Sequence, residues 1–369
     1  MNRLFRWDQT GLFLLALAAG ILPFAVPEVC AAALREGLTL CSGPLLLSLF
    51  PFLVVSRLLV QCPESDLLAL PFRLAAWGIG IRTPCAARVL CIGFLGGFAP
   101  AASAAAQAVR TGQLTAEEAD ALLPACICSG PSFVVLTVGQ SLLGSAELGV
   151  LLFASQITAN YLTAALLNRF AGVRSVKPGS AAPASPAPPR LDEILADAAI
   201  TYCKLCGFIL FFRMLAAGAG ALLPAGAGTL CAILLEVCSG CDLASRTGRW
   251  GSLLCCAALS VQGLSVLLQV RTICPPEMTL RPLYRARMLH LPLSLALFYL
   301  LLPGGEADVF STLPVRVLLM RRVPPDCALL VFAVCCMAAC TLRSGIRQVE
   351  QKQMARNAGG CCINSKTLL

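Results

Sequence analysis

Charged residues are scarce in this chain of 369 residues, at 13% against 58% for hydrophobic residues. A soluble domain carries nearer about 25% charged residues, so the composition excludes an ordinary soluble protein. It predicts a polytopic integral membrane protein of the all-α class, with the lipid bilayer as its first partner.

Histidine is nearly absent, with one residue in the whole chain, whereas cysteine is abundant, with 21. Most cysteines lie inside apolar runs, where a thiol behaves as a small buried hydrophobic group. Two CxxC pairs, Cys203 with Cys206 and Cys238 with Cys241, have the nominal spacing of a zinc or redox site. A structural zinc site needs four convergent ligands, and both pairs lie in or beside apolar helices. We therefore expect no metal and no cofactor.

Lysine and arginine outnumber aspartate and glutamate by 28 to 19. The arginines stand at the ends of apolar runs, and no basic face with interleaved aromatic residues is present, so we expect no nucleic-acid partner. Walker A, GxSxG and HExxH motifs are absent. The acidic group of Glu117, Glu118 and Asp120 is interpreted as a solvated helix face. No enzymatic activity is expected.

Long uncharged runs predict about eight to ten membrane segments, at about 20 residues for a full crossing. The run 9–27 is interpreted as an uncleaved first helix rather than a signal peptide, because it is long and no clean A-x-A site follows. Further spans are expected at 37–56, 148–168, 214–235, 250–270, 289–303 and 326–342. Basic flanks predict a multi-pass protein of the cell membrane, with the N-terminus, the segment 173–190 and the C-terminal tail in the cytoplasm.

Two apolar runs, 93–110, which is uncharged up to Arg110, and 121–146 are interrupted by glycine, proline and serine. Irregular backbone at membrane depth survives only where protein or a water-filled cavity satisfies its polar groups. The first run therefore predicts a re-entrant or broken hairpin that lines an internal cavity. Between the two runs, Thr115 and Glu118 form a capping box that starts a short helix at a membrane edge.

A faint internal repeat lies on either side of residues 173–190, a segment rich in proline, alanine and serine that is interpreted as a semi-rigid linker. The stretch "FLVVSRLL" at 52–59 aligns with "FILFFRML" at 208–215, and "GPSFVVLTV" from Gly130 echoes "GLSVLLQV" from Gly263. Related halves with interrupted hydrophobic segments indicate a transporter-like core whose site lies at the repeat interface. The alternative is that apolar sequences align a little by chance.

The alignment pairs Arg57 with Arg213 and Ser132 with Ser265. Either arginine could pair with a carboxylate or extend to the membrane interface. The predicted organisation has a first transmembrane helix at 1–28, a first membrane half at 29–172, the linker at 173–190, a second membrane half at 191–303, a last loop and helix at 304–342, and a cytoplasmic tail at 343–369.

The order of several motifs carries a resemblance to a known family. The motifs are "LFPFLVVSRLL", "GFLGGFAPAASA", "LTAEEADALL", "CSGPSFVV", "LLEVCSG", "LSVQGLSVLLQV" and "YRARMLH", from about residue 28 to 300. In this order the chain resembles the YlbJ-type sporulation integral membrane proteins, within the wider group that has nucleoside-recognition (Gate) domains. The resemblance implies an all-helical membrane protein involved in forming the spore envelope, with a transport-like role.

The chain departs from the family at several polar positions. Ser103 stands where the family has a lysine after its glycine-rich turn, and Ile127 and Cys128 replace two asparagines before the Ser-Gly-Pro sequence. Leu267 and Leu268 stand where the family has His-Ala before a glutamine. These losses imply either a more apolar site or a function that does not depend on those groups.

Candidate binding residues gather in the interrupted segments. Glu236 is the strongest, because a carboxylate inside a membrane is costly and is a functional candidate by default; the alternative is that it reaches water among the lipid headgroups. The full set is Glu236, Gly96, Gly97, Ser129, Gly130, Ser132, Gln262, Ser265 and Gln269. Close packing and hydrogen bonding between helices are the alternative roles for the small residues and the glutamines. His290 is expected at the membrane interface.

Two functions remain open. The first is a transporter-like protein of the sporulation type, which binds or passes a small molecule or ion through a cavity walled by 93–103, 126–133, 231–241 and 259–269. The second is a non-transport scaffold for assembly of the spore coat or cortex, with other sporulation membrane proteins as partners. Replacement of Glu236 by glutamine is expected to inactivate a transporter and to be tolerated by a scaffold.

Overall fold

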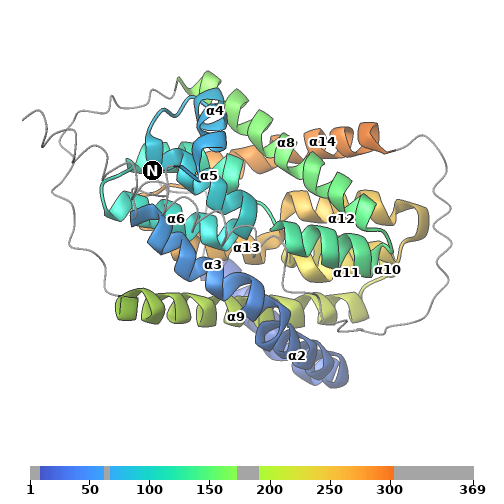
Figure 1. Cartoon of the computed structure of the whole chain (residues 1–369). Helices are drawn as coiled ribbons and strands as arrows, with labels where there is room; N and C mark the ends of the chain where they lie inside the picture. The colour runs from blue at the N-terminus through green and yellow to red at the C-terminus, as the bar shows by residue number, and fades with distance from the viewer. Residues whose placement is uncertain (1–8, 62–66, 173–190, 303–369) are drawn as a thin grey trace, which may run out of the picture.

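The computed structural model of the chain describes residues 9–61, 67–172 and 191–302 (Figure 1). Within these residues the chain is α-helical and has no β-strand, which confirms the predicted all-α class of membrane protein. The predicted linker, the predicted span at 326–342 and the C-terminal tail lie outside the described residues.

Before the linker, the helices are mostly short, because glycine and proline interrupt the apolar runs. They are α1 (Gln9–Ala25), α2 (Pro27–Ser42), α3 (Pro44–Gln61), α4 (Leu70–Gly78), α5 (Pro84–Gly96), α6 (Phe98–Arg110), α7 (Ala116–Cys126), the π-helix η2 (Ser132–Leu142) and α8 (Ala146–Ala171).

After the linker, one long helix is followed by shorter ones. They are α9 (Leu191–Leu222), α10 (Ala225–Leu235), α11 (Val237–Ser245), the 3₁₀-helix η3 (Gly248–Trp250), α12 (Gly251–Val261), α13 (Gly263–Ile273) and α14 (Arg281–Leu301).

In each half, two short helices form a tight hairpin. In the first, α5 and α6 turn back on each other at Gly97, so that a Cβ on Gly93 would lie 3.2 Å from the Cβ of Ala101. In the second, α10 and α11 turn at Glu236, so that a Cβ on Gly240 would lie 2.8 Å from the Cα of Ile233. Residues seven or eight apart in one straight helix would be separated by about 10–12 Å, so both pairs reverse direction. The hairpin predicted at 93–110 is confirmed, but it begins earlier, at Pro84.

Each hairpin is followed by an interrupted helix. In the first half, residues 127–131 separate α7 from η2. In the second half, α12 and α13 are separated by Gln262 alone, which has a left-handed backbone with φ of 62°. A further helix, α8 or α14, completes each half. The same order of elements therefore occurs twice, and Gly130 and Gly263, paired by the sequence echo, both lie at the interruption of the second element.

The long helix α9 connects the two halves. It packs against α2 and α3 of the first half and against α10 and α13 of the second. Two ion pairs reinforce this position: Arg57 contacts Asp197 at 2.7 Å, and Arg213 contacts Glu36 at 2.8 Å. Both arginines therefore pair with carboxylates across the halves, one of the two roles considered for them.

Among the described residues, three helical stretches are long and apolar enough to cross a membrane: α8, α9 and Gly248–Ile273, the last of which is interrupted at Gln262. A fourth candidate is the pair α1–α2, which bends by 108° between Ala25 and Pro27. The single span predicted at 37–56 is wrong, because α2 ends at Ser42 and α3 starts at Pro44. Proline lacks an N–H to continue the helical hydrogen bonds, so the Gly43–Pro44 step ends one helix and starts another.

The capping box at the start of α7 is confirmed. Thr115 Oγ1 accepts a hydrogen bond from the Glu118 N–H at 3.1 Å, and Glu118 Oε2 accepts one from the Thr115 N–H at 3.1 Å. The interpretation of these carboxylates as a solvated face is wrong for Glu118 and Asp120, which are buried. Asp120 accepts hydrogen bonds from the N–H groups of Thr279 and Leu280 and thereby holds α7 to the loop before α14.

The turn of the first hairpin gives a test of its packing. Gly97 and Gly144 both have positive φ, at 81° and 74°, so alanine at either position is strained by about 1–2 kcal/mol. Only at Gly97 would the new Cβ also collide with another segment, at 2.7 Å from the Gly130 nitrogen; nothing lies within 4 Å at Gly144. We expect Gly97→Ala to lower the thermal unfolding midpoint in detergent clearly more than Gly144→Ala. Equal losses would contradict the close contact.

Candidate functional site

The turns of the two hairpins contact the interruptions of the two helices that follow them. In the first half, Gly97 lies against Gly130, so that a Cβ on Gly97 would lie 2.7 Å from the Gly130 nitrogen. In the second half, a Cβ on Gly263 would lie 2.9 Å from the Glu236 nitrogen. We call these contacts the first and second crossing points. At each of them backbone lies directly on backbone, which only glycine permits.

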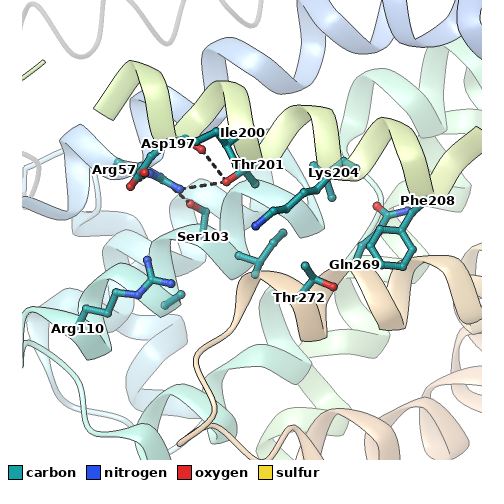
Figure 2. A pocket seen from close by; sticks show the side chains of 13 residues that line it. Arg57, Ser103, Arg110, Asp197, Ile200, Thr201, Lys204, Phe208, Gln269 and Thr272 are labelled. Atoms are coloured by element: carbon teal, nitrogen blue, oxygen red, sulfur yellow. Dashed lines mark hydrogen bonds and ion pairs between the residues drawn. The ribbon is translucent and has the colours of Figure 1, made fainter. Parts of the chain in front are cut away.

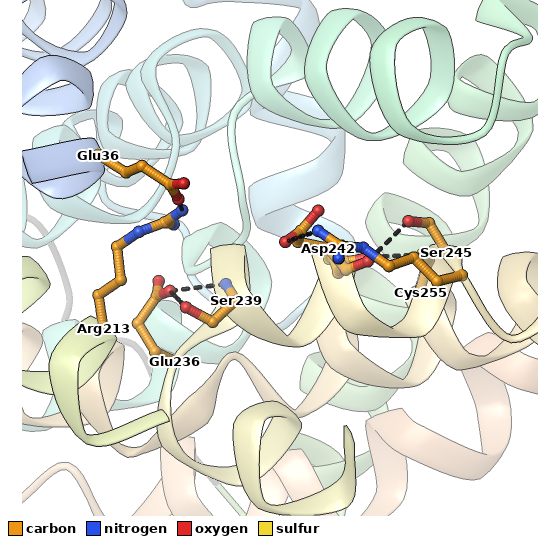
Figure 3. A network of polar contacts seen from close by, with 9 residues as sticks. Glu36, Arg213, Glu236, Ser239, Asp242, Ser245 and Cys255 are labelled. Carbon is orange, nitrogen blue, oxygen red and sulfur yellow. Dashed lines mark hydrogen bonds and ion pairs between the residues drawn. The ribbon is translucent and has the colours of Figure 1, made fainter. Parts of the chain in front are cut away.

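Glu236 is buried at the second crossing point, with 2% of its surface exposed, so it does not reach headgroup water. It is the N-cap of α11 (Figure 3). Its Oε1 accepts a hydrogen bond from the Cys238 N–H at 2.9 Å, and its Oε2 accepts from the N–H and the hydroxyl of Ser239 at 2.7 and 2.9 Å. A carboxylate at a helix N-terminus satisfies free N–H groups and interacts favourably with the helix dipole. Both carboxylate oxygens therefore hold the hairpin turn in place.

Gln262 joins the second crossing point to the first. Its side-chain nitrogen donates to the carbonyl oxygen of Ile127 at 3.3 Å, in the interrupted segment of the first half. About two helical turns further on, the Gln269 amide nitrogen donates to Ser265 Oγ at 2.9 Å. The side-chain carbonyl oxygens of Gln262 and Gln269 are buried and have no hydrogen-bond partner among the described residues.

Arg287 is a buried cation that the sequence reasoning missed as a site residue. Its guanidinium donates to the Ile127 carbonyl at 2.6 Å, to Asn160 Oδ1 at 3.4 Å and to the Ser260 carbonyl at 3.4 Å. Ile127 and Ser260 lie at the C-terminal ends of α7 and α12, where carbonyl groups lack helical partners and carry partial negative charge. The Arg287 guanidinium thus stabilises the C-terminal ends of both α7 and α12.

Only the helical period of α14 could have indicated this role. Arg281 and Arg285 are four residues apart and share an exposed face, whereas Arg287 lies about 200° around the helix from Arg285, at about 100° per residue, and is buried. His290 follows Arg287 on the buried side, with 1% of its surface exposed. The expectation that His290 lies at the membrane interface is therefore wrong; its Nε2 lies 3.2 Å from the Gln156 carbonyl oxygen.

A polar network surrounds His290 between α8, α12 and α14. The Gln156 side chain donates to Ser260 Oγ at 3.0 Å and to the Cys256 carbonyl at 3.3 Å, and Ser260 also shares a hydrogen bond with Ser294. All of these side chains except Cys256 are polar, and all are buried. Such networks hold helices together where no water is available.

A cavity of about 150 Å³ lies between the two halves (Figure 2). Its walls come from α3 and α6 of the first half and from α9 and α13 of the second. The lining residues are Arg57, Ser103, Ala106, Arg110, Asp197, Ile200, Thr201, Lys204, Leu205, Phe208, Gln269, Thr272 and Ile273. Arg57 anchors one end, where it contacts Asp197 and donates to Ser103 Oγ at 3.3 Å and Thr201 Oγ1 at 3.2 Å.

The predicted site residues divide between the cavity and the crossing points. Gln269 lines the cavity, and Ser265 orients it. The remaining residues lie at or beside the two crossing points: Gly96, Gly97, Ser129, Gly130, Ser132, Glu236 and Gln262. A cavity walled by all four interrupted segments stays a prediction. The cavity between the halves takes Ser103 and Gln269 from two of these segments, and α3 and α9, which the sequence reasoning did not assign to it, complete its walls.

Because Glu236 caps α11, its glutamine variant is expected to change the stability of the protein as well as any activity. An amide presents an NH₂ group where a carboxylate oxygen now accepts, so Glu236→Gln leaves a buried N–H without an acceptor, at a cost of about 1–3 kcal/mol. We expect Glu236→Gln to lower the thermal unfolding midpoint, and Glu236→Asp, a good N-cap, to lower it less. A stable, normally folded Glu236→Gln protein would contradict the capping role.

Arg287 can be tested in the same way. Methionine removes all donors to Ile127 and Ser260, whereas lysine retains a charge with three donors. We expect Arg287→Met to destabilise the protein by about 2–3 kcal/mol, since a hydrogen bond to a charged group contributes about 1.5–3 kcal/mol. Arg287→Lys should lose less, as measured by thermal unfolding in detergent; equal losses would show that the charge is not what stabilises the helix ends.

Comparisons with known proteins identify no relative of this chain. No family model, no curated protein and no solved structure matches the chain.

Proposed function

We propose that the chain is a transporter-like protein of the cell membrane that binds a small molecule between its two related halves. The observation that carries the proposal is the cavity whose walls come from both halves, with α3 and α6 on one side and α9 and α13 on the other. A relative movement of the halves would open and close such a cavity, which is how repeat-built transporters give alternating access. The resemblance to YlbJ-type proteins adds sporulation as the process served.

The interrupted helices supply elements that could move. The second helix of the first hairpin, α6, and the second part of the interrupted helix of the other half, α13, both contribute to the cavity, and each directly follows a break in the chain's helical structure. A break without helical hydrogen bonds is a natural hinge, since a few residues absorb the change in backbone angles. Gly97 and Gln262 occupy these two breaks.

Arg287 bears on how such a transporter would be driven. In many transporters, unwound backbone carbonyls and the C-terminal ends of half-helices coordinate a coupling cation. In this chain the Arg287 guanidinium occupies the C-terminal ends of α7 and α12. We therefore propose transport that needs no sodium ion at this place.

The cavity would open towards the cytoplasm. Five of its six residues on α9, from Asp197 to Leu205, lie in the half of that helix nearer residues 173–190. The basic residues beside that segment favour a cytoplasmic position. The N-terminus and the C-terminal tail would lie on the same side.

A scaffold for spore-envelope assembly is the second candidate, and the crossing points favour it. The carboxylate oxygens of Glu236 are already engaged by α11, and Gly97 lies directly against Gly130. Residues that looked like substrate contacts in the sequence therefore hold the fold together. A protein of this kind would present its surface to other sporulation membrane proteins instead of binding a solute.

Cysteine labelling separates the two candidates. Ala106 and Ala104 lie two residues apart on α6, both almost fully buried, but only Ala106 lines the cavity. In a background with the native cysteines replaced, Ala106→Cys should react with a membrane-impermeant thiol reagent from each face of oriented vesicles. Ala104→Cys should be protected from both.

Each other outcome counts against transport. Labelling of Ala106→Cys from one face alone would mean a cavity that never changes sides, as in a receptor or scaffold. Protection from both faces, in protein that unfolds normally on heating, would mean that water does not reach the cavity.

A further inference from the structure

We propose that the cavity between the halves is a binding site for a small phosphate group that also carries a hydroxyl. The inference rests on the proposed function, whose solute class it names. Its basis is the charge of the cavity wall, one buried acceptor oxygen in that wall, and the size of the space.

The cavity wall has an excess of positive charge. Arg57, Arg110 and Lys204 line it, with Asp197 as the only carboxylate among the lining residues. Arg57 is already paired with Asp197 at 2.7 Å. Within the described part of the chain, no ion pair or side-chain hydrogen bond engages Arg110 or Lys204. Two cations therefore remain for a ligand.

The two cations come from different halves. Arg110 ends α6 and Lys204 lies on α9, and Figure 2 shows both side chains extending towards the space between α6, α9 and α13. An oxyanion placed there would bind one cation from each half and so hold the halves together. Without an oxyanion between them, the positive charges of Arg110 and Lys204 repel each other.

Asp197 is the internal competitor for this site. Its carboxylate pairs with Arg57, yet 63% of its side chain is exposed, so it can leave Arg57 at little cost. Arg57 is the better anchored partner, because Ser103 and Thr201 also accept hydrogen bonds from it. An incoming oxyanion would displace the Asp197 carboxylate and take its place on the guanidinium, a group suited to bind phosphate through two hydrogen bonds.

Gln269 selects among oxyanions. Its side-chain carbonyl oxygen is buried and has no partner among the described residues, while its amide nitrogen is held by Ser265. An unpaired buried acceptor costs about 1–3 kcal/mol, which a ligand hydroxyl would recover when the side-chain amide turns this oxygen into the cavity. Hydrogen phosphate and phosphate esters of polyols carry such a hydroxyl, whereas sulfate, of similar size and charge, carries none at neutral pH.

The size of the cavity agrees with a small ligand. At about 150 Å³ it matches the liquid volume of about five water molecules, at about 30 Å³ each. That is enough for inorganic phosphate or for the phosphate end of a larger molecule. The phosphate could thus be free in solution or belong to the headgroup of an anionic lipid, since both present the same chemistry.

The first experiment measures binding of inorganic phosphate to the full-length protein in nanodiscs of zwitterionic lipid, at constant ionic strength. We expect phosphate to bind at least tenfold more tightly than sulfate. Lys204→Gln and Arg110→Gln should each weaken phosphate binding about tenfold. Asp197→Asn should strengthen it several-fold, because the competing carboxylate is gone. Loss of folding cannot explain a gain of affinity, so this variant keeps the test independent of stability.

The matched control is Arg249→Gln. Arg249 is also an exposed cation, but it lies over the ring of Trp250 and away from the cavity. Its replacement should leave phosphate binding unchanged, whereas an equal loss in all three charge-removing variants would mean that phosphate responds to net charge alone, and would overturn the proposal. Failure of the wild-type protein to bind phosphate in any nanodisc would overturn it as well.

Nanodiscs that contain phosphatidylglycerol distinguish the two sources. If the lipid headgroup occupies the site, binding of inorganic phosphate should fall in these nanodiscs, and the thermal stability gained from the lipid should be lost in Lys204→Gln. If phosphate binding is the same in both nanodiscs, the ligand is a soluble phosphate compound. The binding experiment is independent of the Ala106→Cys labelling. Phosphate binding together with labelling from one face alone would refute transport but keep the phosphate site. Labelling from both faces without phosphate binding would refute the phosphate site but keep transport.

Discussion

The carbonyl oxygen of Ile127 is the point on which the rest of the structure depends. It accepts hydrogen bonds from Arg287 at 2.6 Å, from Gln262 at 3.3 Å and from Asn160 at 3.5 Å. These donors come from α14, from the interruption after α12, and from α8. An interrupted helix inside a membrane leaves backbone groups that water cannot satisfy. In this chain side chains of three other elements satisfy them, and the interruption becomes the place where both halves are joined.

The second constraint is the burial of charge. Arg57 and Arg213, both largely buried, find carboxylates on Asp197 and Glu36, each time across the boundary between the halves. No carboxylate of the described residues pairs with Arg287, and the partial negative charges of helix ends stabilise its charge instead. The helix α9 takes part in both ion pairs and also forms a wall of the cavity. Any movement that opens the cavity therefore acts on the Arg57–Asp197 pair, which couples the cavity to the contact between the halves.

The crossing points show why the polar residues named from sequence were ambiguous. Glu236 has the costly burial expected of a functional carboxylate, yet its partners are the N–H groups of its own hairpin turn. Gly97 and Gly263 permit backbone to approach backbone, which is also what a ligand contact would require. A residue that holds the fold together and a residue that contacts a ligand can be of the same type and equally buried. The difference lies in which atoms fill the space in front of each group, and that depends on how the chain turns at Glu236 and on which segment packs against each glycine.

The sequence by itself determined the helical, membrane-embedded character of the protein, the capping box at Thr115 and the interruption of each half, because these follow from composition and from neighbouring residues. It also indicated the doubling, through Gly130 with Gly263 and Arg57 with Arg213. Only the tertiary structure decided that Arg287 and His290 are buried, that Glu236 caps α11, and that the cavity lies along α9. Each of these depends on contacts between residues more than a hundred positions apart or on the direction of a hairpin. Local sequence does not specify such contacts, because the same helix can pack with either face inward until its partners are in place.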